Sequence, residues 1–313
     1  MLKAVLADFR AWGEFPVLTT LDRRLGGVSL PADRVVVLDA EVYPASLVEL
    51  ADSCAAVLMI APETGGTLER LSTLMLDTGV CLLGSRPEAV AVAADKWECH
   101  RLFQSAGLPT PETVRTTPAA AAGAAEELGF PLVVKPIHGA GCEGVGLVRG
   151  AGMLERALDQ PSLRRVESLL LQRYIDGTHA SVSLLVSGSD SVPLSLNEQR
   201  VRADIPFVYE GGVAAVSHSR RSQALDLARQ AVALVPGLQG YVGVDLMLTE
   251  EGCWLIEINP RLTTSYIGVR RVVDINLAEA TWRACREGVL PKVVVTAAAA
   301  SFGKEELDGH GDA

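Results

Sequence analysis

Residues 241–259 read Tyr-Val-Gly-Val-Asp-Leu-Met-Leu-Thr-Glu-Glu-Gly-Cys-Trp-Leu-Ile-Glu-Ile-Asn, and this stretch decides the fold. Two apolar runs flank Glu250-Glu251-Gly252, and glycine readily takes the positive φ that a tight turn needs. We therefore predict a β-hairpin with a three-residue loop. The register of such a hairpin places Thr249 opposite Cys253.

The same register places Asp245 opposite Glu257, and the period of two puts Asn259 on the face of Glu257. Directly opposed like charges destabilise a sheet unless a cation lies between them or one is protonated. Two carboxylates and an amide form an all-oxygen ligand set of the kind that Mg²⁺ prefers, with Mn²⁺ as an alternative. The other interpretation is a solvated face paired with arginines. We favour the metal site, because Leu246 and Leu255 indicate buried strands.

A glycine-rich loop follows a predicted strand that carries Lys135. Gly139, Gly141 and Gly144 satisfy G-x-G-x-x-G, but a dinucleotide site requires a helix after the loop. Here Val145–Val148 reads as a strand, so we predict a flap whose backbone N–H groups cover phosphates and towards which Lys135 projects. The alternative is a glycine-rich hairpin with a surface lysine.

Composition excludes several classes of protein. The 313 residues carry a formal net charge of −10, which disfavours a nucleic-acid partner. The six cysteines form no C-x-x-C pair, which argues against a disulfide framework or a thiolate zinc site. No apolar run is long enough to span a membrane, and the N-terminus lacks the apolar core of a signal peptide. We expect a soluble, cytoplasmic protein.

The length predicts several subdomains. Strand and helix signals alternate up to about residue 90, which predicts a parallel α/β sheet. Its predicted strands are Ala4–Ala7, Val35–Leu38, Ala56–Ile60 and Val80–Leu83. Further on we predict helices over 96–107, 119–128 and 275–287, and strands over 130–135 and 169–172. The predicted units are an N-terminal domain (1–94), a small subdomain with the flap (95–167), a large subdomain with the metal site (168–300) and a tail (301–313).

These features together resemble the ATP-grasp superfamily over about residues 95–270. The resemblance is carried by Lys96, Lys135, the glycine loop, Gln172-Arg173-Tyr174-Ile175 and the hairpin with its Asp245…Glu257-x-Asn259 pattern. It implies an α/β (α+β composite) fold, with the ATP-grasp part preceded by a parallel α/β domain. It also implies ATP and magnesium as cofactors, an acyl-phosphate intermediate, and a homodimer as the common assembly.

The resemblance also implies roles for single residues. Lys96 and Lys135 would hold the ATP phosphates, and the backbone of residues 172–175 would contact adenine. Asp245, Glu257 and Asn259 would bind the metal, and Arg261 would steady the transferred phosphoryl group. Many members bind ribose through a glutamate after the hinge, whereas this chain has Gly177-Thr178-His179. Asp176 or His179 is expected to serve instead, although His179 is equally consistent with a surface histidine.

Two short stretches, Asn259–Tyr266 and Ala180–Leu185, resemble the tyramine–L-glutamate ligases of methanofuran-type cofactor synthesis. This likeness implies that the side-chain carboxylate of L-glutamate is activated and joined to tyramine. The residues that would contact substrate are Asn197, Tyr209, Gly211, Ser265 and Tyr266, with Phe207 near the tyramine ring. Glu198 or Glu210 would accept the proton of the amine, and modification of Cys142 in the flap would inhibit the enzyme.

Two other functions are compatible with the sequence. The same fold could act on another pair of substrates, such as two amino acids, a carbamate or a thiol. The chain could also be a non-catalytic ATP-binding module. A complete set of phosphate and metal ligands argues against the module, because binding alone does not need a phosphoryl-transfer site.

Overall fold

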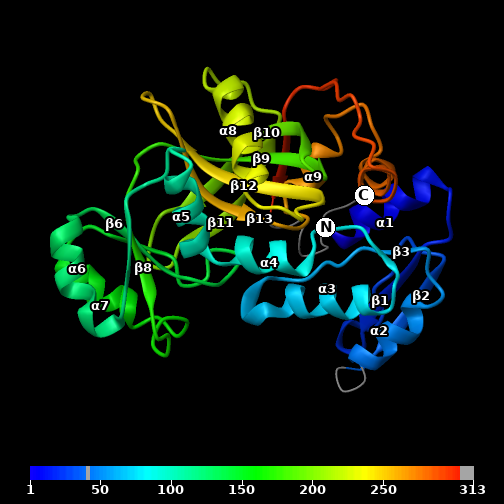
Figure 1. Ribbon diagram of the computed structural model, residues 1–313, viewed down its shortest axis with the longest axis horizontal. Helices are drawn as coiled ribbons and strands as arrows, with labels where there is room; N and C mark the ends of the chain where they lie inside the picture. The colour runs from blue at the N-terminus through cyan, green and yellow to red at the C-terminus, as the bar shows by residue number, and fades with distance from the viewer. Residues whose placement is uncertain (40–42, 304–313) are drawn as a thin grey trace.

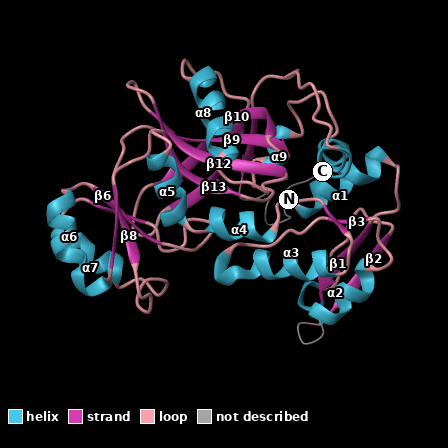
Figure 2. Ribbon diagram, viewed as in Figure 1, coloured by secondary structure: helices cyan, strands magenta, loops and turns pink. Residues whose placement is uncertain are grey.

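The structure is a computed structural model that describes residues 1–39 and 43–303. Figure 1 shows a small lobe at one end, a large lobe with a central sheet, and an N-terminal unit at the other end. Helices and strands are mixed in all three parts (Figure 2). The predicted α/β composite fold with a preceding α/β unit is confirmed.

The large lobe is built on a six-stranded antiparallel sheet with the strand order β13-β12-β9-β10-β11-β14. Because side chains alternate along a strand, each face of the sheet has its own core. Helices α8, α4 and α5 cover one face, and α9 and α10 cover the other. The elements are α4 (Pro87–Ala94), α5 (Lys96–Ser105), β9 (Thr178–Ser187), β10 (Asp190–Arg202), β11 (Val208–Ala214), α8 (Arg221–Ala233), β12 (Gly240–Leu248), β13 (Cys253–Asn259), α9 (Tyr266–Val269), α10 (Leu277–Trp282), the π-helix η4 (Arg283–Glu287) and β14 (Ala300–Gly303).

The small lobe has a four-stranded antiparallel sheet in the order β5-β8-β6-β7. Helices α6 and α7 pack on it around Leu132, Leu154 and Leu169, which are buried. Its elements are β5 (Thr113–Thr116), η3 (Pro118–Ala120), α6 (Ala121–Leu128), β6 (Leu132–Pro136), β7 (Gly146–Val148), α7 (Ala151–Leu158) and β8 (Leu169–Arg173).

The N-terminal unit contains two separate pairs of parallel strands, β1-β2 and β3-β4, instead of one continuous sheet. A mainly apolar cavity of about 1010 Å³ lies between α1, α2, β1 and β3. The elements are α1 (Leu2–Trp12), β1 (Leu18–Asp22), η1 (Arg23–Leu25), β2 (Arg34–Leu38), α2 (Tyr43–Ala51), β3 (Ala56–Val57), η2 (Thr64–Gly66), α3 (Thr67–Asp77) and β4 (Cys81–Leu82).

The prediction of a strand over Ala4–Ala7 is wrong, because these residues lie inside α1. Apolar residues recur at the spacing of one helix face, namely Leu2, Val5, Leu6 and Phe9. This helical period, and not the short apolar run, determines the local structure. Val5 and Leu6 are accordingly buried.

Three predicted boundaries also need correction. Strand β8 pairs with β5 and β6, so it belongs to the small lobe and not to the large subdomain that was predicted to begin at residue 168. Helix α5 packs through Cys99 and Phe103 into the core of the large lobe, although it was assigned to the small subdomain. Residues 301–303 are part of β14 and not of a tail, while residues 304–313 lie outside the described residues.

The hairpin has the predicted carboxylate pairing but a different turn. Leu248 and not Thr249 is paired with Cys253, and a bulge between Asp245 and Leu246 shifts the register by one residue. This shift brings Asp245 opposite Glu257, as predicted. A β-bulge thus compensates for a loop that is one residue longer than expected.

Replacing Phe302 with alanine should destabilise the large lobe. The side chain is only 2% exposed and packs into the core formed with α9 and α10. Loss of a buried phenylalanine typically costs about 3–5 kcal/mol. Denaturant unfolding should show this loss for Phe302→Ala, whereas Leu25→Ala, at an exposed position, should leave the unfolding free energy nearly unchanged. Equal stabilities of the two variants would contradict the placement of β14.

Candidate active site

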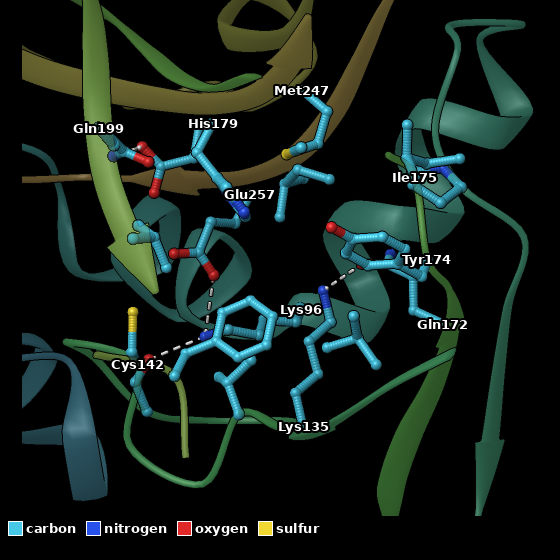
Figure 3. Close-up of a pocket in the computed structure, with 18 of the residues that line it drawn as sticks. Lys96, Lys135, Cys142, Gln172, Tyr174, Ile175, His179, Gln199, Met247 and Glu257 are labelled. Atoms are coloured by element: carbon cyan, nitrogen blue, oxygen red, sulfur yellow. Dashed lines mark hydrogen bonds and ion pairs between the residues drawn. The ribbon is translucent and has the colours of Figure 1, made fainter. Parts of the chain in front are cut away.

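A cleft between the small and large lobes collects most of the predicted site residues (Figure 3). Its walls come from β6 and the glycine loop on one side and from β12 and β13 on the other, and the segment after β8 closes one end. The cavity has a volume of about 120 Å³ and is partly open to solvent.

Asp245 and Glu257 face each other across β12 and β13 at the base of the cleft. Asp245 accepts hydrogen bonds from Gln199 Nε2 at 2.9 Å and from Asn259 Nδ2 at 3.1 Å. Burial, followed by the charge of Glu257, raises the pKa of Asp245. Burial would also raise the pKa of Glu257, but Lys96 and Lys135 outweigh it and hold that pKa below its ordinary value.

This pair fits a divalent metal. Two carboxyl groups that disfavour each other's ionisation would both be stabilised as anions by a cation between them. In residues 1–39 and 43–303, no group of three or more His, Cys, Asp or Glu residues is placed to hold a metal. A metal here would therefore take Asn259 as its third protein ligand, and rotation of the amide would present its oxygen. Such an all-oxygen set suits Mg²⁺ or Mn²⁺.

Lys96 connects the flap with the carboxylate pair. It is the first residue of α5, which begins there because the Asp95 side chain caps the N–H groups of residues 97 and 98. Its Nζ donates to the carbonyl of Gly139 at 2.8 Å and lies 3.2 Å from Glu257 Oε2. Burial alone would lower the pKa of Lys96, but the charge of Glu257 raises it. The side chain is therefore a fixed positive charge in the cleft.

Lys135 lies at the end of β6 and is 4% exposed. Its Nζ donates to Gln172 Oε1 at 2.9 Å, and Gln172 Nε2 donates to Thr113 Oγ1 at the same distance. Burial lowers the pKa of Lys135 to about 8. The side chain of Gln172 thus orients Lys135, a role that the sequence did not indicate. Gln172 is itself one of the residues that line the cleft.

The glycine loop requires its glycines. Gly139, Gly141 and Gly144 have φ of 151°, 69° and 72°, which other residues rarely adopt. A Cβ at Gly144 would also lie 2.6 Å from the hydroxyl of Ser162. In the described part of the chain, the backbone N–H groups of residues 140–142 have no protein acceptor, which leaves them available to phosphate oxygens. Burial raises the pKa of the Cys142 thiol to about 12, so its alkylation at neutral pH should be slow.

The hinge segment lines the opposite end of the cleft. Arg173, Tyr174 and Ile175 contribute to the lining, whereas Asp176 is exposed and does not. His179 also lines the cleft, makes an edge contact with Phe207 at 6.0 Å between ring centroids, and has its pKa lowered by burial. Of the two candidates for a ribose contact, His179 is therefore the one that borders the cleft.

Three of the predicted substrate residues belong instead to the core. Asn197 is fully buried and hydrogen-bonds with Ser183 and Ser195. The Ser265 hydroxyl forms hydrogen bonds with the hydroxyls of Tyr241 and Thr263. The Tyr266 hydroxyl donates a hydrogen bond to Oδ2 of the buried Asp8 at 2.7 Å. Their hydrogen-bonding groups are satisfied within the protein, so none is free to contact a substrate.

Tyr209 and Gly211 lie on β11 outside the lining of the cleft. The Tyr209 hydroxyl is bonded to Thr264 at 2.8 Å, and its pKa is raised to about 12 by burial, with a smaller contribution from Asp245. Gly211 passes close to the backbone of Phe302, where a Cβ would meet the carbonyl oxygen at 2.4 Å. Gly211 is thus needed for strand packing, whereas Tyr209 remains a candidate substrate contact.

Neither carboxylate considered for proton transfer lies in the cleft. Glu210 is exposed and forms an ion pair with Arg202 at 3.4 Å. Glu198 precedes Gln199, a lining residue, and so projects from the opposite face of β10. The sequence already contained this information, because adjacent residues of a strand point to opposite faces of the sheet.

Arg261 contacts a residue that the sequence did not indicate. Its Nε lies 2.9 Å from Oε2 of Glu63, which comes from the N-terminal unit and is only 5% exposed. The negative charge of Glu63 also contributes to the raised pKa of Lys96. The one signal in the sequence was the Pro-Glu-Thr-Gly-Gly turn at 62–66 after a predicted strand.

Two family models match the chain. The model of the ATP-grasp domain matches residues 93–265, and that of the pre ATP-grasp 3 domain matches residues 15–90. Tyramine--L-glutamate ligase from Methanocaldococcus jannaschii is 32% identical over 216 residues, which are 68% of this chain. The match spans only 58% of the length of that relative.

Solved structures show the same fold at low sequence identity. One is the biotin carboxylase domain of Hydrogenobacter thermophilus 2-oxoglutarate carboxylase, a dimer in complex with MgADP and bicarbonate. Its TM-score is 0.78 and its sequence identity 17%, over 93% of this chain and 68% of its own. L-amino acid ligase from Bacillus licheniformis has a TM-score of 0.73 and 18% identity over 91% of this chain and 71% of its own.

Binding of MgADP should weaken as Lys135 loses its proton. With a pKa of about 8, Lys135 is mostly charged at pH 7 and mostly neutral at pH 9, and only the charged form attracts phosphate. We expect the Kd of MgADP, measured by calorimetry, to rise up to about tenfold between these pH values. Lys135→Met should bind weakly at both. The same pH dependence in Lys135→Met would contradict this account.

Proposed function

The chain belongs to the ATP-grasp family, and from that premise we propose that it is an ATP- and magnesium-dependent carboxylate–amine ligase. In this proposal ATP phosphorylates a carboxylate, an amine displaces the phosphate, and an amide, ADP and phosphate result. The observation that carries the proposal is the meeting of two buried lysines, a flap with free N–H groups and a facing pair of carboxylates in one cleft.

Each group has a role that follows from its position. Lys96 and Lys135 would place positive charge beside the phosphates, where it stabilises charge that develops during phosphoryl transfer. A magnesium ion on Asp245, Glu257 and Asn259 would offset the negative charge of the phosphates. The flap, which Lys96 holds by a hydrogen bond to the Gly139 carbonyl, would exclude water from an acyl phosphate that hydrolyses readily. Arg261, at the end of β13, would steady the transferred phosphoryl group.

For the substrates, we propose L-glutamate, activated at its side-chain carboxylate, and tyramine. The proposal is supported by the 32% identity to the tyramine--L-glutamate ligase of M. jannaschii. Tyr209, which lies near Asp245, would border the site of the amine. The likeness to an L-amino acid ligase makes ligation of two amino acids the second candidate. We propose a homodimer as the assembly, as in the H. thermophilus domain.

The proposal is tested by measuring ADP release with MgATP, L-glutamate and tyramine, with each substrate also supplied alone. We expect ADP only when both are present, together with a product whose mass equals their sum less water. ADP released with a different acid and amine would retain the chemistry and reject these substrates.

Variants of the carboxylate pair provide the control. Asp245→Asn and Glu257→Gln keep the size of each side chain and remove its charge, so ADP formation should fall by at least ~100-fold. Glu210→Gln changes an exposed carboxylate on β11 and should retain the rate. Unchanged rates in both cleft variants would mean that the carboxylates do not hold a catalytic metal.

A further inference from the structure

Glu63 is a buried acidic residue whose partner in the structure is a guanidinium group. It approaches Arg261 to 2.9 Å, and its charge acts on Lys96. A carboxylate here opposes the binding of phosphate, which the proposed reaction requires of this region. It is also buried, and a buried charge is costly unless a specific partner compensates it. This cost suggests a function for which a negative charge is needed.

Glu63 occupies a position at which α/β proteins commonly bind ligands. It follows β3 in a loop at the carboxyl end of a parallel strand pair, and α3 begins four residues later. In α/β sheets, ligands bind outside the carboxyl ends of the strands. The N-terminal unit contacts the chain here at Arg261, two residues beyond Asn259, the last residue of β13 and a proposed metal ligand.

We propose that Glu63 binds the ammonium group of the amine substrate and accepts a proton from it during amide formation. This assignment rests on the proposed ligase function. Arg261 exchanges partners: it leaves Glu63 for the anionic acyl phosphate, and the ammonium takes its place on the carboxylate. One cation replaces another, so Glu63 is never left buried without a positive partner.

The step is balanced in protons and electrons. A proton passes from the ammonium nitrogen to the Glu63 carboxylate, and the lone pair released on nitrogen attacks the carbonyl carbon of the acyl phosphate. The bond from that carbon to the bridging oxygen breaks, and phosphate leaves with the bonding electrons. The second proton lost by the nitrogen passes to the departing phosphate. The products are an amide, phosphate and a protonated Glu63, which releases its proton when the site opens.

The assignment distinguishes cationic from neutral nucleophiles. Hydroxylamine is uncharged at neutral pH, so it does not need an ammonium-binding carboxylate to attack the acyl phosphate. Tyramine is cationic and does need one. We therefore expect Glu63→Gln to lower kcat/KM for tyramine by at least ~100-fold with L-glutamate and MgATP. Hydroxamate formation from L-glutamate and hydroxylamine should stay within about threefold of wild type.

Two further variants complete the experiment. Glu69→Gln removes a carboxylate from α3 in the same segment and should behave as wild type in both assays. Glu63→Asp keeps the charge but shortens the reach, so it should lose at least ~10-fold with tyramine and keep hydroxamate formation. If Glu63→Gln does not fold, as judged by thermal unfolding and MgADP binding, Glu63→Asp decides the question alone.

The outcomes separate this assignment from the proposed function. Wild-type protein that forms neither amide nor hydroxamate contradicts the proposed activation of L-glutamate, on which this assignment rests. With an active wild type, equal losses of both products in the Glu63 variants would mean that Glu63 only holds Arg261. Retention of both products would mean that Glu63 has no part in the reaction.

Discussion

The contact of the Lys96 ammonium with both Glu257 and the carbonyl of Gly139 is the interaction on which the cleft depends. It joins the start of α5, the flap and strand β13, which belong to different parts of the fold. Without this cation, two partly buried carboxyl groups would face each other with less compensation, and desolvation already raises the pKa of Asp245. The charge of Lys96 is thus a condition for keeping Glu257 ionised in the interior.

A buried polar network lies beside Asp245 on the same face of the large sheet. Tyr241, Ser183 and Ser265 form a hydrogen-bonded group within the large sheet, and Asn197 joins it through Ser183. A fully satisfied network of this kind has one favourable arrangement, whereas apolar side chains could repack. The same network explains why Asn197 and Ser265, which were predicted as substrate contacts, have their hydrogen-bonding groups occupied within the protein.

Local patterns predicted the elements with a clear period. The hairpin, the glycine flap and the pairing of Asp245 with Glu257 all follow from alternation and turn chemistry over fewer than twenty residues. What depends on distant packing was missed. Glu63 and Arg261 are 198 positions apart and meet only through docking of the N-terminal unit. Tyr266 was misjudged for the same reason, because its partner Asp8 is 258 positions away.

The cavity between β1 and β3 has a consequence for cooperativity. In the part of the chain that the structure describes, each of these strands pairs with one neighbour, so no hydrogen-bond ladder crosses the N-terminal unit. Two half-sheets separated by a void can open one without the other, at a free energy below that of global unfolding. The loop that carries Glu63 follows β3, so the position of this carboxylate depends on how that half-sheet is held against the large lobe.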